Sequence, residues 1–166
     1  TLRISNNRVH HSGSGIHIEE SNRYDVIEDN RLHDLSGHGI YRHYSSDYNG
    51  SGQIRRNVIN RAGSWAISCD GYLGTYDVSR NKIDGGGSPN SQGIQVQQMK
   101  NITVRQDTIQ NTTGTGIEVN RSSGYATSQW KVVGSVIKDN GYYGMQIEYA
   151  SVTVDSNTIS GHSGRG

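Results

Sequence analysis

The sequence predicts an all-β solenoid of about six to seven coils, each built from three short strands. Three observations lead to this class. One phrase of alternating apolar and polar residues recurs along the whole chain, three copies end in Gly-Ile followed by an apolar residue two positions later, and glycine, asparagine and serine separate the apolar stretches. Alternation with a period of two is typical of strands, and a phrase repeated along a chain is typical of a stacked array.

Each copy supplies one apolar position to each of three columns. The first strand of each coil is centred on a β-branched residue: Ile4, Ile27, Ile54, Val78, Val104, Val132 and Val154. The second strand carries the middle column: Val9, Leu32, Ile59, Ile83, Ile109, Ile137 and Ile159. The third strand opens on the third column: Ile16, Ile40, Ile67, Ile94, Ile117 and Met145. Because stacked strands lie ~4.8 Å apart, each residue is expected to pack on its counterpart in the next coil, which suits β-branched side chains.

A polar column precedes the middle column by two residues. Its members are Asn7, Asn30, Asn57, Asn81, Asp107, Ser135 and Asn157. Asparagine tolerates the left-handed conformation that a sharp corner needs, and stacked side-chain amides can hydrogen-bond along an array. We therefore expect a ladder of asparagines at one corner of the solenoid.

Composition excludes several classes of partner and site. Lys and Arg number 16 and Asp and Glu 15, a net charge of +1 that argues against nucleic acid as the partner. No stretch approaches the ~20 apolar residues that cross a bilayer, so no membrane partner is expected. Cys69 is the only cysteine and is expected to be a small buried residue. No cluster of Asp and Glu suits calcium, so we expect neither a metal nor a cofactor.

The repeat resembles the right-handed parallel β-helix proteins of the pectate-lyase-like superfamily over nearly the whole chain. The resemblance implies a single right-handed parallel β-helix domain over residues 1–166. That superfamily includes pectate and alginate lyases, polygalacturonase-type hydrolases, mannuronan C5-epimerases, phage tailspikes and adhesins, so the fold leaves the activity open. It also implies an extracellular or virion-surface location.

The repeat begins and ends in mid-pattern, without the terminal caps that solenoids need. We therefore expect the chain to be part of a longer protein whose open ends are covered by flanking domains or by end-to-end self-association.

The resemblance places a substrate groove along the sheet of third strands. Residues alternate in and out along a strand, so outward side chains form two columns with a third rank at the strand ends. The side chains expected to bind a polysaccharide or oligosaccharide are His17, Tyr41, Gln95, Gln97, Glu118, Asn120, Arg121, Gln146, Glu148 and Tyr149.

Within that face, Glu19, His43 and Asp70 are expected on successive coils. A histidine between two carboxylates would have a raised pKa and could act as a general acid or base. The two carboxylates would lie ~9.6 Å apart, near the long end of the ~6.5–9.5 Å separation of inverting glycosidases. The alternative is a surface charge ladder that stabilises the stacking of coils.

The stretch "HGIYRH" resembles the Tyr-Gly-Phe-Asp-Pro-His motif that mannuronan epimerases and related lyases carry on this strand. Gly39, Ile40 and His43 match the motif. The other positions are His38, Tyr41 and Arg42, where the motif has Tyr, Asp and Pro. "GHG" also resembles a polygalacturonase-type motif, but the acidic residues that accompany it are missing, so no role is assigned to His38.

Abstraction of a proton next to a carboxylate needs a neutraliser, a base and an acid, and Arg42, His43 and Tyr44 could fill these roles. Arg42, however, interrupts an otherwise apolar inward column, where an unpaired charge would be costly. Either the strand bulges and turns Arg42 outward, or Arg42 pairs with a carboxylate near the wall.

Two hypotheses for function follow. The first is a polysaccharide-binding domain that also modifies its ligand as a lyase, hydrolase or epimerase. The alternative is a non-catalytic glycan-binding or structural β-helix of a phage tail fibre, tailspike or adhesin. Long loops follow two of the third strands, at 44–52 and 121–130, and their tyrosines are expected to border the groove.

Overall fold

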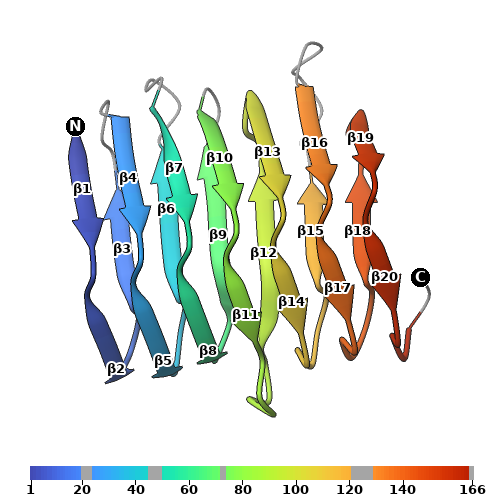
Figure 1. Cartoon of the computed structure of the whole chain (residues 1–166), viewed down its shortest axis with the longest axis horizontal. Coiled ribbons are helices and arrows are strands. Elements are labelled where there is room, and N and C mark those ends of the chain that lie inside the picture. Colours follow the sequence, from blue (N-terminus) through green and yellow to red (C-terminus); the bar gives the residue numbers. More distant parts are fainter. Residues whose placement is uncertain (20–23, 45–49, 72–73, 121–128, 165–166) are drawn as a thin grey trace.

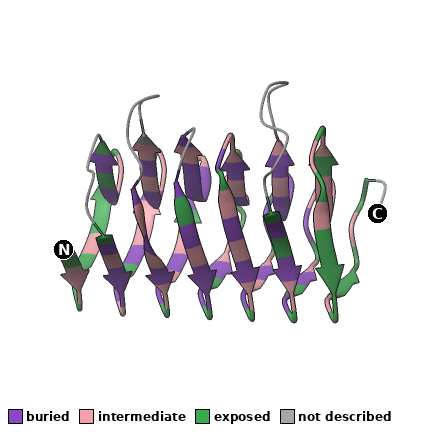
Figure 2. Cartoon of the chain, turned by 90° about the horizontal axis from the view of Figure 1, so that it is seen from above, coloured by how far each residue is buried: buried purple, intermediate pink, exposed green. Residues whose placement is uncertain are grey.

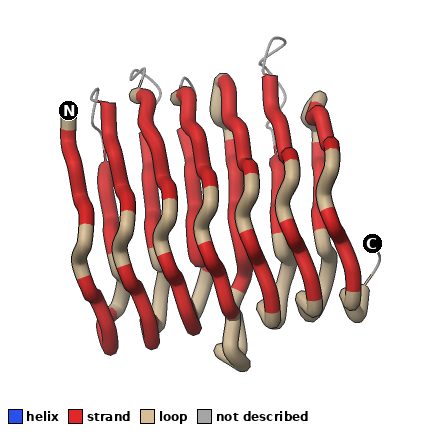
Figure 3. The backbone as a smooth tube through the Cα atoms, in the orientation of Figure 1, coloured by secondary structure: helices blue, strands red, loops and turns tan. Residues whose placement is uncertain are grey.

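The computed structural model describes residues 1–19, 24–44, 50–71, 74–120 and 129–164. These residues form a parallel β-solenoid in which the chain advances coil by coil from one end to the other (Figure 1). Strands alternate with turns throughout the described part (Figure 3). No helix that could cross a bilayer occurs among the described residues. The predicted all-β solenoid of three-stranded coils is confirmed.

Three parallel sheets run along the solenoid, one for each strand of the coil. The first sheet is β1 (Leu2–Ser5), β4 (Tyr24–Glu28), β7 (Ser51–Arg55), β10 (Thr75–Ser79), β13 (Asn101–Arg105), β16 (Gln129–Val133) and β19 (Val152–Asp155). The second sheet is β2 (Arg8–Ser12), β5 (Arg31–Leu35), β8 (Val58–Ala62), β11 (Lys82–Asp84), β14 (Thr108–Gln110), β17 (Val136–Lys138) and β20 (Thr158–Ser160). The third sheet is β3 (Ile16–Glu19), β6 (Ile40–Tyr44), β9 (Trp65–Gly71), β12 (Gln92–Gln97), β15 (Ile117–Asn120) and β18 (Met145–Glu148).

The solenoid has about five turns that are enclosed by neighbours on both sides, slightly fewer than the six to seven coils predicted. In each of the two seven-stranded sheets of the described chain, two strands are edges, which leaves five with a partner on either side. The residues of the outermost coils are correspondingly more exposed than those of the coils between them (Figure 2). Val154 and Ile159 in the last coil are exposed, whereas their counterparts Val132 and Ile137 are buried.

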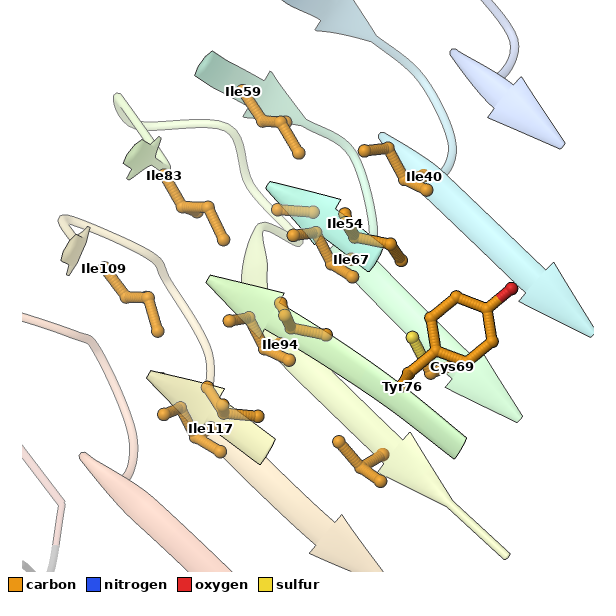
Figure 4. Packing of buried hydrophobic residues seen from close by; sticks show 14 of the residues in the cluster. Ile40, Ile54, Ile59, Ile67, Cys69, Tyr76, Ile83, Ile94, Ile109 and Ile117 are labelled. Atoms are coloured by element: carbon orange, nitrogen blue, oxygen red, sulfur yellow. The ribbon is translucent and has the colours of Figure 1, made fainter. Parts of the chain in front are cut away.

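The core is made of the three predicted apolar columns, and the strand registers confirm each of them. Ile27 pairs with Ile54 in the first sheet, and Ile54 with Val78. The second and third columns continue in the same way, and Figure 4 shows their isoleucines stacked from coil to coil. Burial of each such side chain stabilises the fold by roughly 1.5–3 kcal/mol.

The asparagine ladder is confirmed at the corner between the first and second sheets. Asn30 Nδ2 donates to Asn57 Oδ1 at 3.0 Å, and Asn57 Nδ2 donates to Asn81 Oδ1 at the same distance. The backbone N–H of each asparagine donates to the same oxygen of the next coil, at 3.1 Å and 3.0 Å. Asn57 and Asn81 also donate to backbone carbonyls of Ile27 and Ile54 in the coil before.

The left-handed bend at this corner lies one residue earlier than predicted. Asp29, Arg56 and Arg80 have φ of 57°, 54° and 56°, whereas the asparagines that follow them are not in this region. Each asparagine instead supplies the hydrogen bonds that hold the bent backbone in place. Its contribution is therefore polar satisfaction of a buried corner.

Asp107 is the carboxylate member of the ladder. Its Oδ1 accepts from the backbone N and Nδ2 of Asn81 at 2.7 Å and 2.9 Å, while Oδ2 is buried without a hydrogen-bond partner among the described residues. Burial raises the pKa of Asp107 from its ordinary value of 3.8 to about 8, against the opposing effect of the bonds from Asn81. A protonated Oδ2 can donate as an asparagine Nδ2 does, so the acid form suits this place.

Replacing Asp107 with asparagine is expected to remove a pH dependence of stability. Because the folded pKa is raised, the stabilising contribution is fully present below pH ~4 and is lost as the pH rises through about 8. Urea unfolding of the Asp107→Asn variant should show a gain of about 2 kcal/mol over the parent at pH 9 and no gain at pH 4. Asp155→Asn, at an exposed site, is the control, and an Asp107→Asn variant with the parent's pH profile would contradict this account.

Candidate functional site

The outer face of the third sheet carries two columns of polar side chains in register. One column contains His17, Tyr41, Ser68, Gln95, Glu118 and Gln146, and the other contains Glu19, His43, Asp70, Gln97, Asn120 and Glu148. Because strands in a sheet lie ~4.8 Å apart, the columns present one side chain per strand interval. The predicted alignment of these residues is thus correct.

Tyr41 is the centre of an aromatic cluster on this face. The His38 ring stacks on it with centroids 5.0 Å apart, and the His17 ring meets it edge-on at 4.8 Å. The His43 ring is nearly parallel to it at 6.0 Å. His38 was left without a role in the sequence, but the structure places it in this cluster.

Two of the histidines have a carboxylate neighbour. His43 Nδ1 lies 3.4 Å from Asp70 Oδ2, close enough for an ion pair but without the alignment of a hydrogen bond. His17 Nε2 lies 2.9 Å from Glu19 Oε1 on its own strand. Among the described residues no ion pair joins Glu19 to His43, so the expected histidine between two carboxylates is reduced to one pair.

Glu19 turns to His17 for a geometric reason. Residues i and i+2 of a strand lie on the same face, and both of these side chains are exposed at the edge strand β3. The register places His43 on the neighbouring strand, ~4.8 Å from Glu19 and nearer than the ~6.6 Å between residues i and i+2 of one strand, so the sequence favoured the other partner.

The surroundings of Tyr41 and Asp70 raise the pKa of both groups. Burial raises the pKa of Asp70, while His43 and the backbone N–H of Gly71 oppose the rise. Burial and the nearby carboxylates of Asp70 and Glu19 raise the pKa of Tyr41. A carboxyl group with a raised pKa beside an imidazole can exchange protons with it, which is the chemistry of a general acid or base.

The other half of the face is a network of amides and carboxylates. Ser68 Oγ donates to Gln95 Oε1 at 3.0 Å, and Gln95 Nε2 donates to Glu118 Oε1 at 3.3 Å. Further along, Asn120 and Gln146 both donate to the carboxylate of Glu148, at 3.4 Å and 2.6 Å. Three of these four bonds join neighbouring coils and the fourth joins Gln146 to Glu148 within β18. Ser68 is buried, whereas the other side chains of the network remain partly exposed.

Arg42 does not belong to this face, which corrects its assignment to catalysis. Its side chain is 0% exposed, and the pairing of β6 with both neighbours continues through it without a bulge. Arg42 Nη2 and Nε lie 2.9 Å and 3.0 Å from Asp25 Oδ2. The second explanation of the sequence anomaly, pairing with a carboxylate, is the correct one.

The buried group around Arg42 contains two residues that sequence reasoning missed. Asp25 is fully buried and faces the interior from the first sheet, and the Tyr76 hydroxyl lies 3.1 Å from Asp25 Oδ2. Gly52 leaves the space between them, since a Cβ there would meet the Asp25 carbonyl and lie 3.0 Å from the Tyr76 ring. The sequence did mark these two residues as inward-facing, because Asp25 and Tyr76 stand in the same register column as the apolar residues Leu2, Ile102 and Trp130.

Arg42 nevertheless supports the site through hydrogen bonds to the backbone beneath it. Its Nη1 donates to the backbone carbonyls of His43 at 2.8 Å and Ile18 at 3.2 Å. These bonds tie the backbone under the His43 side chain to the core. Arg42 is thus a positioning residue for the face rather than a contact for a ligand.

Some of the predicted site residues lie outside the residues that the structure describes. Arg121 and most of the two long loops, 45–49 and 121–128, lie outside the described residues, as does the side chain of Tyr44. Tyr149 follows β18 and is the most exposed of the large apolar and aromatic side chains described.

The described residues hold no group of three or more His, Cys, Asp or Glu side chains that could bind a metal ion. Cys69 is buried, and burial raises the pKa of its thiol to about 12, so it is a core residue.

The fold and this face define a parallel β-solenoid with a polar, aromatic-bearing outer sheet. The chain belongs to a family whose model, described as a right-handed β-helix region, matches residues 1–166. Searches of curated proteins and of solved structures found no significant match.

Replacing Arg42 with leucine is expected to destabilise the fold by roughly 3–5 kcal/mol, because Asp25 would keep a buried charge without its partner. The Asp25→Leu/Arg42→Leu double variant should recover much of that loss. Urea unfolding of the parent, the single and the double variant measures both quantities. A single variant as stable as the parent would show that the buried pair does not hold the two sheets together.

Proposed function

We propose that this chain binds a linear polysaccharide along the outer face of the third sheet. The observation that carries the proposal is the pair of polar columns, in which amide, carboxyl and aromatic groups recur at each strand interval. A sugar chain offers hydroxyl groups at regular intervals, and a row of fixed donors and acceptors matches it. Aromatic rings such as that of Tyr41 add faces against which sugar rings stack.

A merely solvated face would also be polar, but two features favour a binding face. The side chains of Ser68, Gln95 and Glu118 are held by hydrogen bonds between coils, so less side-chain freedom is lost when a ligand binds. The aromatic cluster around Tyr41 keeps rings partly exposed at one end of the same face.

Catalysis at His43 is the second candidate, and the pairing of His43 with Asp70 favours it. In a lyase or epimerase step, His43 would remove the proton next to a sugar carboxylate. That step also needs a cation to neutralise the carboxylate, and the described outward residues of the third sheet include neither Arg nor Lys. A hydrolase would need two carboxylates across the bond, and Glu19 is engaged with His17.

Of the two candidates, binding without turnover is favoured, because the described outward residues of the third sheet lack the cation that a lyase needs and Glu19 is engaged with His17. Under this proposal the chain works outside the cell or on a virion surface, as a glycan-binding β-helix of the tail-fibre, tailspike or adhesin kind.

Replacing Tyr41 with alanine is expected to weaken polysaccharide binding roughly tenfold, since a stacked ring contributes about 1 kcal/mol or more. Gln95→Ala should weaken it less. The measurement is an array of neutral and acidic polysaccharides, followed by calorimetry on the ligand that binds. Thr103→Ala, on the outer face of the first sheet, is the matched control. Equal losses in Tyr41→Ala and Thr103→Ala would remove the third sheet as the binding face.

Replacing His43 with alanine separates binding from turnover. If the second candidate is correct, the variant loses all cleavage or epimerisation while its melting temperature and glycan affinity stay near those of the parent. Absorbance near ~235 nm reports the unsaturated uronate that β-elimination by a base would form, and a reducing-end assay reports hydrolysis. A His43→Ala protein with full turnover would eliminate His43 as the acid or base.

A further inference from the structure

A second face of the solenoid gathers positive charge that has no carboxylate partner. Arg8, Arg31 and Lys82 point outward from the second sheet in one register column, with Val58 between the last two. Among the described residues none of these three cations is within ion-pair distance of a carboxylate. By contrast, the outer face of the first sheet pairs Arg55 with Glu28 and Arg105 with Asp77.

The three cations line a hollow of about 450 Å³ together with Leu32, His33, Val58 and Asn60. A neighbouring hollow of about 420 Å³ shares Val58, Asn60 and Lys82 with it and continues across β11 and β14. The shared residues make the two hollows one groove across the strands. The first hollow is lined by no carboxylate, and the second by Asp84, which accepts hydrogen bonds from Gln110 and Asn111.

The cationic end of the groove is held in place. Arg8 Nε donates to His33 Nε2 at 3.4 Å, and His33 Nδ1 lies 2.8 Å from Asp34 Oδ2. His33 also stacks on His10 with ring centroids 4.9 Å apart. The Asp34 charge is matched by Arg61, which lies 2.5 Å and 2.9 Å from its two oxygens, so it does not neutralise the groove.

We propose that this groove on the second sheet binds an acidic polysaccharide, separately from the face of the third sheet. Three cations in one hollow, on a chain whose net charge is only +1, give the groove a local charge complementary to carboxylates. Guanidinium groups match carboxylates in a bidentate geometry. Asn60 and Thr108 add uncharged hydrogen-bonding groups for sugar hydroxyls.

The spacing of the cations favours an acidic glycan over a nucleic acid. Arg8 and Arg31 lie on neighbouring strands, ~4.8 Å apart, whereas Arg31 and Lys82 lie two strands apart, ~9.6 Å, with the uncharged Val58 between them. A nucleic-acid strand carries a phosphate every ~3.4 Å along the helix axis, which is much denser. A glycan with a carboxylate on every second sugar matches the wider interval.

The test uses hyaluronan oligosaccharides, which carry a carboxylate on alternate sugars, with the whole chain and its Arg31→Gln/Lys82→Gln variant. We expect the double variant to bind roughly tenfold more weakly, from the loss of two partly exposed ion pairs. Lys131→Gln, which removes an exposed cation from the first sheet, should bind as the parent does. In a Tyr41→Ala background the Arg31→Gln/Lys82→Gln exchange should still weaken hyaluronan binding roughly tenfold, which distinguishes this groove from the face of the third sheet.

Two measurements on the parent protein test the proposal without any variant. Hyaluronan with methyl-esterified carboxylates keeps the sugar framework but loses the charge, and it should not shift the backbone NMR signals of the groove on the second sheet. Ionic strength near 1 M, where the Debye length is ~3 Å, should abolish binding of the acid form. Binding of the ester in the groove of the second sheet, an equal loss in Lys131→Gln, or tighter binding of single-stranded DNA than of hyaluronan would each overturn the proposal.

Discussion

The stacking of each residue on its counterpart in the next coil is the constraint on which this structure depends. At the corner between the first and second sheets, every enclosed asparagine bonds to the asparagine or aspartate above it and to a carbonyl of the coil below. These bonds satisfy buried polar groups that would otherwise be costly. They also fix the register, so the three apolar columns meet in the core. If one side chain of the ladder were displaced, buried polar groups would lose their partners and the register between coils would no longer be fixed there.

Because the scaffold is repetitive, residues that break the repeat indicate what else the molecule does. Arg42 breaks an apolar column, and the break is matched inside the core by Asp25, Tyr76 and the space beside Gly52. That buried group ties the first sheet to the backbone of His43. On the outside, the rings near Tyr41 and the cations near Arg31 mark two different faces. One face is rich in aromatic and amide groups and the other in unpaired positive charge, so we propose different ligands for them.

The columns and the polar ladder could be predicted from sequence because parallel stacking turns a period in the chain into a contact in space. Side-chain partners were harder to predict. The register brings Glu19 nearer to His43 than to His17, and only the side-chain geometry shows that it turns to His17. The partner of Arg42 lies 17 residues earlier on another sheet. The column register marks Asp25 as an inward polar residue, but it does not show which side chain Asp25 meets. The second sheet's groove was missed because its cations are spread over three coils.

The most direct test of the account is a backbone NMR titration of the parent chain with a neutral polysaccharide that it binds on an array. Each amide reports on its own coil, so the affected residues identify the face. The account predicts shift changes confined to the outward residues of the third sheet, strongest around Tyr41 and His43, with the asparagine ladder unchanged. Changes centred on the first sheet, or spread evenly over all three, would contradict it.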